Sequence, residues 1–110
     1  MTLNDYQTQA RTTFTIENDL TRQVTYLALG LNGEAGEVAE KIKKILRDTD
    51  VDFKKLNLDD IKKELGDVLW YVSTLSNILG LELEDVAKTN LEKLSSRKER
   101  GALQGSGDNR

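Results

Sequence analysis

Two segments of the pattern E-x-G-[E/D]-V in this chain of 110 residues each carry a pair of acidic residues three positions apart. Glu34 and Glu37 lie in the segment EAGEV, and Glu64 and Asp67 lie in the segment ELGDV. Because positions three apart share one face of a helix, each pair would present two carboxylates to the same side. Four such carboxylates predict a site for a divalent cation. Oxygen ligands without His or Cys favour hard ions such as Mg²⁺ or Mn²⁺.

The composition excludes several other kinds of site. The chain has no Cys and no His, which removes disulfides, thiolate metal sites and the usual general base. A net charge of −3 argues against binding to nucleic acid. No apolar run is long enough to span a membrane and no signal peptide is visible, so we expect a cytoplasmic protein.

The periodicity of apolar residues, together with the absence of Pro, predicts an all-α fold. We expect an antiparallel bundle of about four helices, over residues 3–14, 20–47, 58–79 and 83–98. A break at 15–18 and a loop at 48–57 would separate the first three. Residues 1–100 would form one domain, and 101–110 a flexible tail, because the tail is rich in Gly, Ser and polar residues.

The two long helices each carry an apolar stripe, and the acidic pairs lie on the same edge of both stripes. Packing the stripes together would bring the four carboxylates close, where they would repel one another without a cation. The first stripe comprises Val24, Leu27, Leu31, Val38, Ile42 and Ile45, and the second comprises Ile61, Leu65, Val68, Val72, Leu75 and Leu79.

Glycines inside these helices weaken them by roughly 0.5–1 kcal/mol each relative to Ala. Gly30 and Gly33 therefore predict either a break in the helix or the close approach of a partner backbone or a ligand. We favour close approach, with an irregular helix around residues 30–33. Gly36 and Gly66 occupy equivalent places between the paired acids, which suggests helix contact across a subunit interface.

One face of the last predicted helix carries Asn90, Lys93 and Arg97. An amide, a point charge and a guanidinium fork could bind the phosphates of a substrate held by the metal, although an ordinary solvent-exposed face has the same composition. Lys41 and Lys44 are weaker candidates, because helical pairing with Glu37 and Glu40 accounts for them.

Two aromatic residues of the second long helix lie near its acidic pair. Tyr71 is one turn beyond Asp67 and could stack on a nucleobase or simply cover the rim of the core. Trp70 points away from the stripe, where it could serve a subunit contact.

Taken in order, three motifs resemble the MazG-type, all-α nucleoside triphosphate pyrophosphohydrolases. They are GLNGEAGEV at 30–38, KELGDVLWY at 63–71, and NLEKL at 90–94 followed by Arg97. The resemblance implies metal ligands at Glu34, Glu37, Glu64 and Asp67, and phosphate contacts at Asn90, Lys93 and Arg97. It also implies a helical bundle that completes its site in a dimer or tetramer. Gly33 stands where relatives often carry a further acidic residue.

The predicted activity is Mg²⁺-dependent hydrolysis of a nucleoside triphosphate to the monophosphate and pyrophosphate. With no His in the chain, the base would be a Glu, either Glu34 or Glu37. The alternatives are a non-catalytic helical module that binds nucleotides or a protein partner, and a phosphoribosyl-ATP pyrophosphohydrolase. The sequence does not indicate which base or sugar the site would accept.

Overall fold

A computed structural model describes residues 1–17 and 19–110. The described residues form four α-helices, a short 3₁₀-helix and no strand, which confirms the all-α prediction. The predicted break at 15–18 includes Asn18, which lies outside the described residues. The helices are α1 (Leu3–Arg11), α2 (Leu20–Thr49), α3 (Leu58–Ile78) and α4 (Leu83–Glu99), and the 3₁₀-helix is η1 (Phe53–Lys55).

Side-chain caps determine where the first three helices begin. Thr2 forms a capping box at α1, Asp19 accepts a hydrogen bond from the backbone N–H of Arg22 at α2, and Asn57 caps α3. Gly80 follows α3 with φ +75°, a left-handed conformation that Gly adopts without strain.

The second helix is longer and more regular than predicted. It continues to Thr49, and it runs without interruption through Gly30 and Gly33, so the predicted irregularity there is wrong. Packing against α3 along the hairpin compensates for the weak helix propensity of the glycines.

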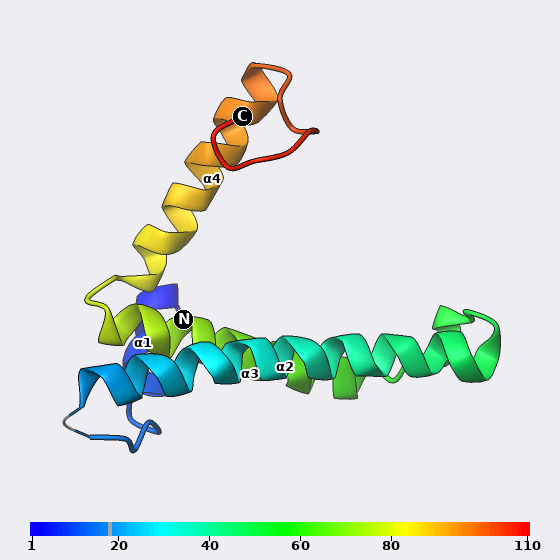
Figure 1. Cartoon of the computed structure of the whole chain (residues 1–110), viewed down its shortest axis with the longest axis horizontal. Helices are drawn as coiled ribbons and strands as arrows, with labels where there is room; N and C mark the ends of the chain where they lie inside the picture. Colours follow the sequence, from blue (N-terminus) through cyan, green and yellow to red (C-terminus); the bar gives the residue numbers. More distant parts are fainter. Residues whose placement is uncertain (18) are drawn as a thin grey trace.

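Figure 1 shows α2 and α3 as a long antiparallel hairpin, with α1 packed across α3 and α4 leaving the hairpin at a steep angle. Within the described part of the chain, no Cα atom of α4 comes within 8 Å of one in α2. None of the described helices has the length and apolar character needed to cross a membrane.

Side chains of α1 hold the start of α4. The buried Gln7 amide donates to the carbonyl oxygen of Leu81 (2.9 Å) and accepts from the backbone N–H of Leu83 (3.0 Å). The Asn4 side chain accepts from the N–H of Glu84 (3.2 Å). Two of the free N–H groups at the α4 N-terminus are thereby satisfied from another helix.

The apolar core of the single chain is small. Leu27 is completely buried between the helices, but Leu65 and Leu79 are 53% exposed, so their predicted burial is wrong. Leu91, predicted to supply apolar contacts in α4, is 65% exposed. The reason is that the hairpin is a single layer, and α4 has no helix packed along most of its length.

Candidate metal site

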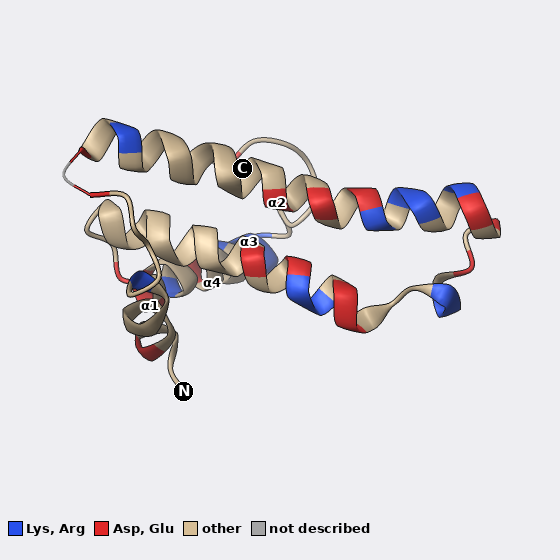
Figure 2. Ribbon diagram, turned by 90° about the horizontal axis from the view of Figure 1, so that it is seen from below, with Lys and Arg blue, Asp and Glu red and all other residues tan. Residues whose placement is uncertain are grey.

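Three predicted ligands come together where the two long helices face each other. Glu34 on α2 and Glu64 and Asp67 on α3 each offer a carboxylate oxygen, and these oxygens lie within 4.8 Å of one another. The antiparallel hairpin accounts for this, because it places the acidic edge of one stripe beside that of the other. Figure 2 shows the acidic segments of α2 and α3 along the same stretch of the hairpin.

The electrostatics of this cluster are those of crowded like charges. Burial, and then the charges of Asp67, Glu64 and Glu37, raise the pKa of Glu34 above its ordinary value. A divalent cation bound among these carboxylates would remove the repulsion. The donors are all oxygen, so the residues present fit Mg²⁺ or Mn²⁺.

Glu37 lies one turn further along α2 and is exposed. It is not among the three residues whose oxygens converge, although its charge contributes to the raised pKa of Glu34. The chain therefore brings together three of the four predicted ligands, with Glu37 at the margin of the cluster.

Lys41 reaches across the hairpin instead of pairing along its own helix. Its Nζ lies 3.6 Å from Glu64 Oε1 and 4.0 Å from Asp60 Oδ2, so the predicted pair with Glu37 is wrong. Glu40 likewise pairs with Lys43 (2.9 Å) rather than with Lys44. The sequence signal for the cross-helix contact was the position of Lys41 on the stripe edge that faces α3.

The ring of Tyr71 lies against the backbone of Gly30, where a side chain would overlap it. The group that comes close at Gly30 is thus a side chain of α3 and not the partner backbone or ligand that we predicted, and in the described part of the chain a Cβ at Gly33 would meet no atom within 4 Å. A hydrogen bond with Tyr26, followed by burial, raises the pKa of Tyr71 to about 12. Tyr71 is thus a neutral phenol at physiological pH and cannot act as a base.

Tyr71 belongs to a cluster of four aromatic side chains beside the carboxylates. Its ring centroid is 4.9 Å from that of Trp70 and 6.2 Å from that of Tyr26, and Phe14 contacts both Tyr26 and Trp70. The Trp70 indole also donates to Thr13 Oγ1 (2.8 Å). Within one chain, Trp70 therefore packs against the segment after α1.

Sequence reasoning missed two tyrosines near the cluster. Burial and the charge of Asp67 raise the pKa of Tyr6, on α1, which indicates that α1 borders the site. Tyr26 precedes Gly30 by one helical turn, and that spacing was the one feature of the sequence that could have placed it near the cluster.

The predicted phosphate-side residues lie away from this cluster within one chain. Asn90 and Lys93 are exposed on α4, which diverges from the hairpin, and Arg97 is 5% exposed near its end. What buries Arg97 is the segment that follows α4, not the carboxylate site.

With this geometry established, a comparison with protein families matches residues 22–101 to the MazG nucleotide pyrophosphohydrolase domain. The chain belongs to the MazG family. The matched residues include α2 from residue 22 onwards, all of α3 and α4 and the segments between them, and so every predicted site residue.

A curated relative of this MazG chain is a protein described as "Gene 37 protein" of Mycobacterium phage L5. It is 56% identical over 87 residues, which cover 79% of this chain and 76% of the relative. The printed name specifies no activity. No solved structure matches the chain. At family level, the protein is therefore a hydrolase of the nucleotide pyrophosphohydrolase type.

Proposed function

We propose that this MazG protein hydrolyses a nucleoside triphosphate to the monophosphate and pyrophosphate in a Mg²⁺-dependent reaction, with Mn²⁺ as a substitute ion. The observation that carries the proposal is the convergence of Glu34, Glu64 and Asp67 from two antiparallel helices, inside a domain of this family. Three oxygen donors leave further positions of a hard cation free for substrate phosphates.

When bound, Mg²⁺ supplies neutralisation of the charge that develops on the phosphate oxygens. Glu34, Glu64 and Asp67 hold it in place. A water attacks the phosphorus and loses its proton to a carboxylate, either Glu34 or the exposed Glu37, while the bond between the α- and β-phosphates breaks and pyrophosphate leaves. Tyr71, fixed against Gly30, offers an aromatic surface on which the nucleobase stacks.

The single chain separates the proposed metal ligands from the proposed phosphate ligands Asn90, Lys93 and Arg97. We propose that self-association as a dimer or tetramer brings α4 to the carboxylate site of another copy. The exposed apolar side chains on three helices support this, because a chain with so small a core leaves much apolar surface in water. They include Leu29, Ile42, Leu46, Leu65, Leu69, Leu91 and Leu94.

The test is incubation of the pure protein with a panel of canonical and modified nucleoside triphosphates and Mg²⁺, with identification of the products. Monophosphate and pyrophosphate in equal amounts are expected. Phosphoribosyl-ATP is added to the panel, and turnover of that compound alone would replace the proposal with a phosphoribosyl-ATP pyrophosphohydrolase. An absence of turnover with every compound would reject catalysis in favour of a binding module.

A further inference from the structure

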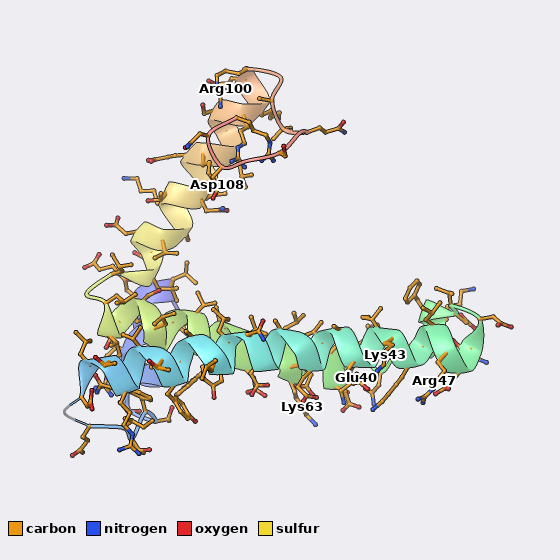
Figure 3. The ribbon with its side chains drawn as sticks, in the orientation of Figure 1. Glu40, Lys43, Arg47, Lys63, Arg100 and Asp108 are labelled. Atoms are coloured by element: carbon orange, nitrogen blue, oxygen red, sulfur yellow. The ribbon has the colours of Figure 1, made fainter. Side chains whose placement is uncertain are left out.

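The C-terminal loop, residues 101–110, turns back and covers the cationic face of α4. Arg97 Nη2 donates to the carbonyl oxygens of Asp108 (2.7 Å) and Gly107 (3.4 Å). Asp108 Oδ1 lies 3.6 Å from both Lys93 Nζ and Arg97 Nη2. Figure 3 shows Asp108 beside α4, on the loop that returns from the end of the helix near Arg100.

The loop has a conformation suited to this return. Gly101, Gly105 and Gly107 have φ values of +66°, +113° and +85°, which residues with a side chain rarely adopt. Arg110 donates to the carbonyl oxygens of Gly107 (2.7 Å) and Leu103 (3.1 Å). The loop thus folds back along α4 and places the Asp108 carboxylate near the two cations.

The loop satisfies Arg97 incompletely. Its guanidinium is almost fully buried, yet its Nε has no hydrogen-bond partner in the described part of the chain. The Asp108 side chain remains 87% exposed, and its oxygen lies beyond hydrogen-bond distance of a guanidinium fork that could donate to two oxygens at once. A phosphate has the oxygens and the charge to satisfy Nε and Nη2 together, so Asp108 is a weak occupant of a site suited to a stronger anion.

We propose that the C-terminal loop is an autoinhibitory segment, in which Asp108 occupies the position of a substrate phosphate on Lys93 and Arg97. A di- or triphosphate must displace the loop before it can contact these cations. That the displacing anion is the polyphosphate of the substrate rests on the proposed function. The competition between Asp108 and a polyphosphate for Lys93 and Arg97 does not. The mobility predicted for residues 101–110 would then be a property of the displaced loop.

This competition lowers the apparent affinity for polyphosphate by the fraction of chains in which the cations are free. Once the loop is displaced, the chemical step proceeds with the same groups. A weakened loop is therefore expected to lower KM for the triphosphate and to leave kcat unchanged.

The test measures calorimetrically the binding of inorganic pyrophosphate, without divalent metal, to the full chain and to variants. Removing the metal leaves the carboxylate cluster repulsive, so binding reports the α4 cations. Asp108→Asn removes the competing charge, and Gly107→Ala disfavours the docked backbone at φ +85° without changing any charge. Glu99→Gln is the matched control, since it removes an acid of the exposed end of α4 that lies outside these loop contacts.

Asp108→Asn and Gly107→Ala are each expected to tighten pyrophosphate binding by about two- to five-fold, as expected for loss of an exposed ion pair or strain at one residue. Glu99→Gln should bind as the wild type does, and adding Lys93→Ala to Asp108→Asn should abolish the gain. Equal affinity in the wild type and both loop variants, or no binding by any of them, would overturn the proposal.

The same variants separate this inference from the proposed activity. Tighter pyrophosphate binding without turnover of any nucleotide would retain the autoinhibitory loop and reject the enzyme. Turnover with the same KM in wild type and both loop variants would retain the enzyme and reject the loop.

Discussion

Gly30 of α2 and Tyr71 of α3 are in direct contact, with the aromatic ring occupying the space that a side chain at residue 30 would need. Glu34 lies one helical turn after Gly30, and Asp67 lies one turn before Tyr71. Because the helices are antiparallel, this contact helps to set the register in which the two carboxylates face each other. An aromatic contact thus positions the candidate metal site.

Replacing Gly30 with Ala should destabilise the protein despite the better helix propensity of Ala. The forced displacement of the Tyr71 ring is expected to cost about 1–3 kcal/mol, against roughly 1 kcal/mol gained in helix propensity. Chemical denaturation would measure the difference. In a Tyr71→Ala background, the same change at Gly30 should be neutral or stabilising.

Gly33→Ala is the matched control for that experiment, since a Cβ at Gly33 meets no atom within 4 Å. It should stabilise the chain by roughly 0.5–1 kcal/mol. If Gly33→Ala and Gly30→Ala have the same effect on the free energy of unfolding, the ring contact does not constrain the hairpin.

Removal of a converging carboxylate should abolish metal-dependent behaviour. Asp67→Asn is expected to reduce Mg²⁺-dependent turnover by at least about a hundred-fold, and to remove the rise in melting temperature that Mg²⁺ gives the wild type. Glu37→Gln is also expected to abolish turnover while preserving the helical circular-dichroism spectrum. If Glu37 is the base, the Mg²⁺-induced rise in melting temperature remains in that variant, and if it is a ligand the rise is lost.

Glu99→Gln, far along α4, is the control for these two substitutions and should behave as the wild type. Mg²⁺ binding should also weaken on acidification, in a range above the ordinary carboxylate pKa, because the pKa of Glu34 is raised and its proton must leave before it can ligate a cation. Unchanged Mg²⁺ stabilisation in Asp67→Asn would place the metal elsewhere.

On α4, Lys93→Ala and Arg97→Ala should each lower kcat/KM by roughly ten- to a hundred-fold, since a charge-assisted hydrogen bond contributes about 1.5–3 kcal/mol. Arg97→Lys should recover only part of the loss, because Lys lacks the guanidinium fork. Steady-state kinetics with Mg²⁺ held in excess would measure this. Wild-type kcat/KM in both Ala variants would show that this face of α4 does not bind substrate.

The titration of Tyr71 predicts a loss of stability in alkali. Its pKa is raised from 10.0 to about 12 in the folded chain, so folding favours the neutral phenol. The resulting stabilisation is fully present below pH 10 and is lost as the pH rises towards 12. The free energy of unfolding of the wild type should therefore fall relative to that of Tyr71→Phe across this range. If the free energy of unfolding changes equally with pH in the two proteins, the raised pKa of Tyr71 is contradicted.

Self-association should depend on the apolar surface of the hairpin. Leu29 is 70% exposed. If the wild type forms the proposed dimer or tetramer, Leu29→Lys is expected to shift it towards monomer in sedimentation at micromolar concentration. Activity should fall as this assembly is lost, since α4 of another copy would complete the site. A fully active wild-type monomer would reject this arrangement.

Local chemistry made much of this fold predictable from the sequence. Apolar periodicity predicted four helices, and in the structure the short polar side chains of Asp19 and Asn57 cap the starts of two of them. The edge positions of Glu34, Glu64 and Asp67 predicted their convergence, because two stripes packed antiparallel bring such edges together. These features depend on residues a few positions apart, which the helical period relates directly.

What only the tertiary structure decided depends on contacts between residues far apart in the chain. Lys41 pairs across the hairpin with Glu64. It lies on the edge of α2 that faces α3, which brings its side chain to Glu64 instead of to Glu37 on its own helix. Gly30 receives the ring of Tyr71, and Arg97 is buried beneath a loop ten residues away in sequence. Helical periodicity specifies which face a residue occupies but not which distant group meets it. That choice follows from how α2 packs against α3 and from how the loop after α4 folds back on that helix.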